Sequence, residues 1–151
     1  MEVFPDFEEW LACLNSVSAD YLIIGGYAVA HHGHPRYTHD LDVFFNLSPD
    51  NVDRILKALH AFGFESLGLT RDDLLKPGTL IQLGNPPAQI DLLNRVTGLT
   101  WEQATADRSP GQYGGVPVDF LGLEALIQNK RATGRAKDLG DVEELDSGGD
   151  S

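Results

Sequence analysis

Apolar residues recur along the chain with the periods of short helices and strands. The clearest helical stripe lies between Pro49 and Phe62, after a serine, Ser48, that suits a helix N-cap. A second stripe runs from Pro5 to Ser16 and begins with a proline, which suits a first helical turn. The pattern therefore predicts two amphipathic helices, each with one buried face.

Short runs typical of strands occur between and after these helices. Tyr21 to Ile24 is apolar, Asp40 to Asn46 alternates in its first half, and Val116 to Leu121 forms a further strand-like run. The runs Leu80 to Leu83 and Gln89 to Leu93 flank a Gly-Asn-Pro-Pro turn, so we expect them to form an antiparallel pair.

Helical patterns also occur between and after the strands, at Tyr27 to His32, Trp101 to Ala106, Leu123 to Thr133 and Lys137 to Leu145. Helices alternating with strands that include a hairpin are typical of an α/β (α+β) fold with a mixed sheet and helices packed mainly on one face. The 151 residues suit one domain, which we place at 1–145, with a polar tail at 146–151 that we expect to be disordered.

The composition excludes several classes of protein. With 42% hydrophobic and 23% charged residues, the chain can bury one core. Its longest apolar stretch, Leu22 to Ala30, covers only about half of a bilayer span, so no membrane insertion is expected. The acidic start does not resemble a signal peptide, and the lone Cys13 allows no internal disulfide. We therefore expect a cytoplasmic protein.

A formal net charge of −12 opposes a broad surface that tracks nucleic-acid phosphates. It does not oppose a local one, because charges are screened over about 8 Å at physiological salt. Four of the eleven Lys and Arg residues lie close together, at Lys130, Arg131, Arg135 and Lys137. RNA therefore stays open as a partner, and adaptation to a salt-rich habitat would explain the acidity equally well.

The segment from Tyr21 to Phe45 carries the candidate chemistry. Gly25 and Gly26 join an expected strand to a helix, where backbone N–H groups and the positive helix end favour phosphate; a plain tight turn is the alternative. Asp40 and Asp42 are two apart on an expected strand and so share a face. Adjacent carboxylates raise each other's pKa unless a cation lies between them, and their hard oxygens suit Mg²⁺. The alternative is a solvated strand face.

Two further charged residues, Asp91 and Lys130, occur within segments of otherwise apolar pattern. Asp91 alternates with Ile90 and Leu92 on a later expected strand, which is typical of an edge-strand charge or of a site residue. Lys130 falls on the apolar stripe of its helix with Leu126. It either extends its stem over the core near the helix C-terminus or reaches a bound phosphate.

Four histidines occur within nine positions, at His31, His32, His34 and His39. Imidazole with carboxylate suits Zn, Fe or Mn, so a transition-metal hydrolase is a rival interpretation. The spacings match no established ligand motif, and consecutive helical positions should splay His31 and His32 apart.

Paired glycines, an Arg-x-Thr-x-Asp-Leu-Asp stretch and a later strand aspartate together resemble the nucleotidyltransferases of the polymerase-beta type, particularly their minimal, abortive-infection-type and toxin-like members. The matching residues are Gly25, Gly26, Arg36, Thr38, Asp40, Asp42 and Asp91. The closing stretch is similar to the family's late helices, which pair a lysine with a downstream arginine and aspartate. The resemblance extends from Tyr21 to about Leu145, which is most of the chain.

This resemblance implies a nucleotidyltransferase fold and transfer of a nucleoside monophosphate from a nucleoside triphosphate (NTP) to an acceptor hydroxyl, with pyrophosphate leaving. The implied catalytic and metal-binding residues, for one or two Mg²⁺ ions, are Asp40, Asp42 and Asp91. The implied nucleotide-binding residues are Gly25, Gly26, Arg36, Thr38 and Lys130.

The acceptor stays open among RNA, protein and small hydroxyl compounds. Larger family members shape the acceptor pocket with a second lobe, so in a chain of this length we expect a homodimer or a separate partner chain to complete it. A non-catalytic nucleotide-binding protein or toxin–antitoxin partner with the same fold is the alternative from another functional class.

Overall fold

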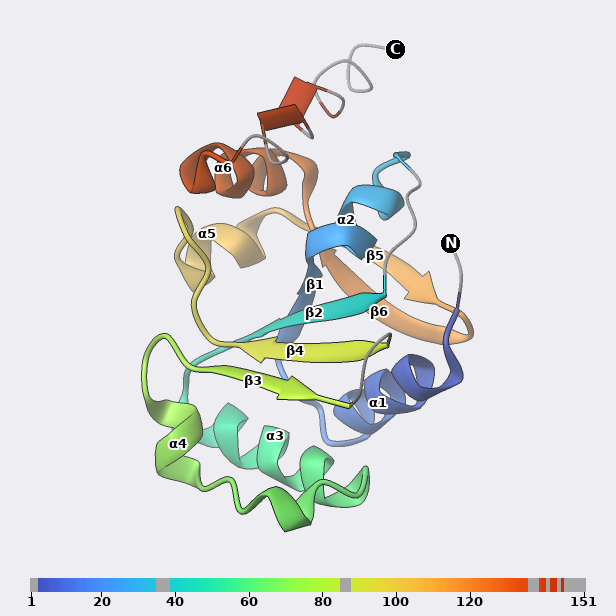
Figure 1. Ribbon diagram of the computed structural model, residues 1–151, viewed down its shortest axis with the longest axis vertical. Helices are drawn as coiled ribbons and strands as arrows, with labels where there is room; N and C mark the ends of the chain where they lie inside the picture. The colour runs from blue at the N-terminus through green and yellow to red at the C-terminus, as the bar shows by residue number, and fades with distance from the viewer. Residues whose placement is uncertain are drawn as a thin grey trace.

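A computed structural model of the chain describes residues 3–34, 39–84, 88–135, 139–140, 142–143 and 145. In chain order the elements are α1 (Pro5–Ser16), β1 (Tyr21–Ile24), α2 (Gly25–His31), β2 (Asp40–Phe45), α3 (Pro49–Ala61), the 3₁₀ helix η1 (Glu65–Leu67), α4 (Arg71–Leu75), β3 (Leu80–Leu83), β4 (Gln89–Leu93), α5 (Trp101–Ala106), β5 (Arg108–Tyr113), β6 (Val116–Leu121) and α6 (Leu123–Thr133) (Figure 1). This arrangement confirms the expected mixed α/β class.

The described strands form one sheet in the order β3-β4-β2-β1-β6-β5. Strand β2 lies near its centre, antiparallel to β1 and parallel to β4. The hairpin of β3 and β4 is antiparallel, as the turn sequence predicts. Strand β2, which carries Asp40 and Asp42, and strand β4, which carries Asp91, are therefore neighbours in the sheet. Along the chain they are separated by α3, η1, α4 and β3.

Alternation along β2 assigns its side chains to two faces. Leu41, Val43 and Phe45 are fully buried on one face, and the two aspartates and Phe44 lie on the other. Helix α1 lies on the Phe45 side, because Tyr21, paired with Phe45 in register, donates its hydroxyl hydrogen to Asn15 near the end of α1 at 2.8 Å. The predicted aliphatic and aromatic stripe of α1 is buried there.

The opposite face of the sheet is partly covered by α5. Its Trp101 packs edge-on against Phe44, with ring centroids 5.0 Å apart. Figure 1 shows α5 and α6 on one side of the strands and α1, α3 and α4 on the other. The acidic face is thus the one that later elements of the chain cover in part.

None of the helices in the described ranges is long and apolar enough to span a bilayer.

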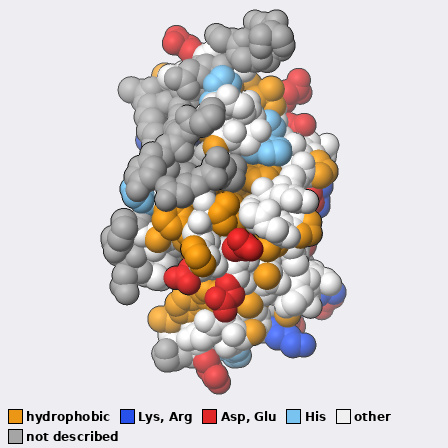
Figure 2. Space-filling model, turned by 90° about the vertical axis from the view of Figure 1, so that its right-hand side faces the viewer, with side chains coloured by type: hydrophobic (Ala, Val, Ile, Leu, Met, Phe, Trp, Pro, Cys, Tyr) orange, Lys and Arg blue, Asp and Glu red, His pale blue; other side chains and the backbone are white. Residues whose placement is uncertain are grey.

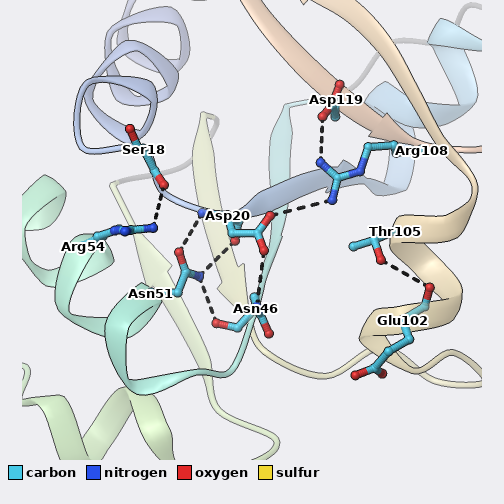
Figure 3. Close-up of polar contacts among 9 residues, drawn as sticks. All are labelled: Ser18, Asp20, Asn46, Asn51, Arg54, Glu102, Thr105, Arg108 and Asp119. Carbon is cyan, nitrogen blue, oxygen red and sulfur yellow. Dashed lines mark hydrogen bonds and ion pairs between the residues drawn. The ribbon is translucent and has the colours of Figure 1, made fainter.

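A polar cluster ties the N-terminal end of β1 to the C-terminal end of β2 (Figure 3). Asn51, in the first turn of α3 and 3% exposed, accepts the backbone N–H of Asp20 at 2.6 Å. Its amide group donates to the carbonyl oxygens of Asp20 and Asn46, both at 2.9 Å. These bonds hold the antiparallel register that sets Ile24 opposite Asp42 at the far end of the pair.

Some elements differ from the sequence prediction. Helix α2 begins at Gly25 and not at Tyr27, so the glycines form its first turn. Strand β5 was not predicted, because its sequence, RSPGQY, contains Pro and Gly; its position at the sheet edge and its hairpin with β6 accommodate them. Short helices η1 and α4 also lack a periodic pattern long enough to predict.

The expected helix over 137–145 lies largely outside the described residues, and the tail at 146–151 lies wholly outside them. Both stay predictions.

The surface agrees with the charge balance: in Figure 2 acidic side chains lie among hydrophobic ones, and few basic side chains are visible among the residues drawn in colour.

Candidate functional site

Asp42 and Asp91 are direct neighbours on the parallel strands β2 and β4. Parallel strands lie about 4.8 Å apart, so paired residues on one face bring their side chains into contact. A side-chain hydrogen bond joins the two carboxyl groups. Such a bond requires a proton on one carboxyl group, and the raised pKa of Asp42 favours its presence there.

The environment of Asp42 favours its protonated form. Burial, followed by the negative charge of Asp91, the hydrogen bond to Asp91 and the charge of Asp40, raises the pKa of Asp42 from 3.8 to about 7. The positive charge of Lys130 acts in the opposite direction and lowers this pKa. A carboxyl group that keeps its proton near neutral pH is a group that a bound cation would deprotonate.

Asp40 lies on the same face of β2 but is exposed. Residues two apart on one strand are roughly 6.6 Å apart, farther than paired residues on neighbouring strands. The sequence prediction that Asp40 and Asp42 share a face is confirmed. The carboxyl group in closest contact with Asp42, however, belongs to Asp91 on the next strand and not to Asp40.

Gly25 lies against this pair from the end of β1. Its neighbour Ile24 is paired with Asp42, and a methyl group added to Gly25 would overlap Oδ2 of Asp42 and lie 3.0 Å from its Cγ. The residue also has a φ of +68°, which L side chains rarely adopt. Glycine is therefore required here for two reasons, backbone conformation and close approach. Gly26 follows in the first turn of α2.

Lys130 brings a cation to the same place from α6. The residue is 7% exposed, which confirms its predicted position on the buried stripe of the helix. Its effect on the pKa of Asp42 shows that its ammonium lies within electrostatic range of that carboxyl group. Its contact with a phosphate stays a prediction.

The structure brings together Asp40, Asp42, Asp91, Gly25 and Lys130, which the sequence singled out over a span of more than one hundred positions. Two other candidates, Arg36 and Thr38, lie outside the described residues.

Two of the histidines, His31 and His32, hydrogen-bond to residues of β5 and β6. Nε2 of His31 lies 2.9 Å from the hydroxyl oxygen of Ser109, and His32 donates from Nε2 to the carbonyl oxygen of Leu121 at 2.8 Å. The two rings are 5.0 Å apart, so the expectation that they splay apart is wrong. The reason is that His32 is the C-cap of α2 and has left the helical geometry.

Sequence reasoning missed Gln89. Its side-chain amide donates to Oδ1 of Asp91 at 2.8 Å. The available signal was the spacing of two on a strand, the same spacing that pointed to Asp40 and Asp42. Because glutamine is uncharged, its position on the strand did not indicate a functional role.

Comparisons with known proteins support the fold. No family model matches the chain, and no curated protein matches it by sequence. A solved structure from Thermotoga maritima, provisionally named a nucleotidyltransferase, matches with a TM-score of 0.55 and 12% identity over 97% of this chain and 92% of that one. The fold is nucleotidyltransferase-like.

A second structure supports the same conclusion. An antigenic nucleotidyltransferase-like protein from Paracoccidioides brasiliensis matches with a TM-score of 0.54 and 17% identity, over 95% of this chain and 77% of that one. At these identities the likeness is one of fold. Within this nucleotidyltransferase-like fold, the acidic pair occupies the central strand β2 and its neighbour β4.

Proposed function

We propose that the protein is a Mg²⁺-dependent nucleotidyltransferase that moves a nucleoside monophosphate from an NTP to an acceptor hydroxyl. The observation that carries this proposal is the Asp42–Asp91 pair, held against Gly25 and within electrostatic range of Lys130. The resemblance to minimal, abortive-infection-type and toxin-like nucleotidyltransferases and the nucleotidyltransferase-like fold both support it.

The residues present fit a divalent cation. Burial and the neighbouring carboxyl groups raise the pKa of Asp42 to about 7, and a hard cation would replace the proton of Asp42 and relieve the repulsion between the charges. In the part of the chain that the structure describes, no group of three or more His, Cys, Asp or Glu side chains could hold a metal. One or two carboxylates, with the remaining positions filled by water and substrate phosphate, are the usual ligands of Mg²⁺.

Each charged residue of the site has a distinct role in this proposal. Asp40 and Asp42 would hold the metal, and Asp91 would either accept the proton of the attacking hydroxyl or hold a second metal ion. When bound, Mg²⁺ would supply charge neutralisation at the transferred phosphoryl group. The buried ammonium of Lys130 would bind triphosphate oxygens.

Glycine at residue 25 would let the Asp42 carboxyl group lie directly against the first turn of α2. Gly25 and Gly26 are proposed as phosphate contacts on the strength of the resemblance. Arg36 and Thr38 are proposed as further phosphate contacts on the strength of the resemblance. The acceptor stays open among RNA, protein and small hydroxyl compounds. The expected homodimer or partner chain is tested by measuring the mass of the protein in solution with and without candidate partners.

Labelled-nucleotide transfer tests the proposal. The protein, Mg²⁺ and each labelled NTP are incubated with transfer RNA, proteins and small hydroxyl compounds in turn, with Asp42→Asn as the inactive control. Transfer to one acceptor class by the wild type alone supports the proposal. Intact Mg²⁺–NTP binding with no transfer to any class would instead favour the non-catalytic nucleotide-binding or toxin–antitoxin alternative.

Thermal stability tests the binding site itself. An NTP with Mg²⁺ at a hundredfold over its Kd should stabilise the fold by about 2.7 kcal/mol, a rise of several degrees in Tm for a chain of this size. Asp42→Asn should abolish the shift while the metal-free variant stays folded. A shift produced by Zn²⁺ alone and lost on substitution of the histidines would support the hydrolase interpretation instead.

A further inference from the structure

Gln89 lies on β4 and forms two hydrogen bonds, one to the residue just before β2 and one to Asp91. It is the first residue of β4, and its backbone N–H donates to the carbonyl oxygen of His39, just before β2, at 3.1 Å. Its side-chain Nε2 donates to Oδ1 of Asp91 at 2.8 Å. Gln89 is paired in register with Asp40, so it lies on the acidic face, next to Asp40 and hydrogen-bonded to Asp91.

We propose that Gln89 is a positioning residue that holds the carboxylate of Asp91 in place for the bound cation. This inference rests on the proposed function. With Oδ1 engaged by the Gln89 amide, the Asp91 carboxylate cannot turn away from Asp42 without losing a hydrogen bond. Hydrogen bonds to the far side of a ligating group orient it and tune its affinity for the metal.

A neutral donor suits this position better than a charged one. A lysine or arginine at residue 89 would also hold Asp91, but its positive charge would repel a divalent cation at the acidic pair. An amide N–H favours the ionised carboxylate without adding a charge to the site. The half-buried position of Gln89 keeps this bond partly shielded from water.

Gln82 provides a matched control on the neighbouring strand. It is paired with Asp91 from the β3 side and therefore lies on the same face, but it is exposed. Among the hydrogen bonds of the described residues there is none between the Gln82 amide and Asp91. The two glutamines share chemistry and face, and they differ in exposure and in the contact to the carboxylate.

The test measures Mn²⁺ binding to the metal-free protein by electron paramagnetic resonance, with Mn²⁺ as a probe for Mg²⁺. Asp42→Asn checks that the ion binds at the acidic pair. Gln89→Met keeps the length of the side chain and removes the amide, and it should weaken Mn²⁺ binding by about tenfold, the lower end of the loss seen for such outer partners. Gln82→Met should leave binding unchanged.

A second variant, Gln89→Thr, guards against misfolding because a β-branched residue suits a strand, and the same loss is expected. In the transfer assay, both Gln89 variants should need more Mg²⁺ for half-maximal rate but keep the KM for NTP at saturating metal. Equal Mn²⁺ affinity in wild type and folded Gln89 variants would overturn the inference and leave the proposed function standing. A wild-type protein that binds neither Mn²⁺ nor Mg²⁺–NTP would overturn both.

Discussion

Replacing Gly25 by alanine tests whether α2 and the acidic pair are as close as the structure places them. An added Cβ would overlap Oδ2 of Asp42 and lie 3.0 Å from its Cγ and 3.3 Å from its Cβ. The Asp42 side chain would have to leave its position and its hydrogen bond with Asp91. Gly68→Ala is the matched control, because Gly68 has a φ of +67°, close to the +68° of Gly25, and no atom within 4 Å of the added Cβ.

The backbone cost is shared by both variants, and only the clash differs. An L residue in the left-handed region costs roughly 1–2 kcal/mol, which is the whole effect expected for Gly68→Ala. For Gly25→Ala, moving Asp42 to an unfavourable rotamer adds about 0.5–1.5 kcal/mol, and the lost hydrogen bond adds about 1 kcal/mol. The free energy of unfolding should therefore fall by about 2.5–4.5 kcal/mol in Gly25→Ala.

Urea denaturation gives the two free energies of unfolding, and the Tm shift with Mg²⁺ and an NTP gives the effect on the site. We expect Gly25→Ala to lose the shift and Gly68→Ala to keep it. Equal destabilisation of the two variants, with the ligand shift retained in both, would refute the close packing of Gly25 on Asp42.

Three further predictions concern the acidic pair and its support. Asp91→Asn should lower the pKa of Asp42 from about 7, because a neighbouring charge is removed; carboxyl NMR titration measures it, and an unchanged pKa would contradict the pairing. Between the ordinary value of 3.8 and about 7, the folded metal-free chain holds the extra proton on Asp42, so its stability should fall as pH rises through this window. Tm measured against pH in chelator should show a shallower fall in Asp42→Asn, and equal slopes would argue against this. Asn51→Leu removes three hydrogen bonds and leaves the half-buried Asp20 N–H and Asn46 carbonyl without the amide, while the Asp20 carbonyl keeps the backbone N–H of Asn46. The loss should cost about 3 kcal/mol in urea denaturation, whereas a cost below about 1 kcal/mol would mean that water replaces the amide.

Local patterns were enough to predict most of the helices and strands and part of the site. The stripes of α1 and α3, the capping serine and the runs of the β3–β4 hairpin are properties of adjacent residues, and the structure has them where the sequence predicts them. The shared face of Asp40 and Asp42 follows from the strand period in the same way. Strand β5 and helix α4 were missed because their residues show no clear strand or helix period.

Contacts between distant segments were decided by packing. Nothing in the local pattern of β4 determines that it pairs parallel to β2 with Asp91 beside Asp42, since strand order and register depend on which apolar faces are buried together. The approach of Gly25, the burial of Lys130 and the bond from Gln89 follow from that arrangement. Residue types and their periods could be predicted along the chain because they depend on near neighbours. The Asp42–Asp91 pair exists only once β2 and β4 have paired in this register.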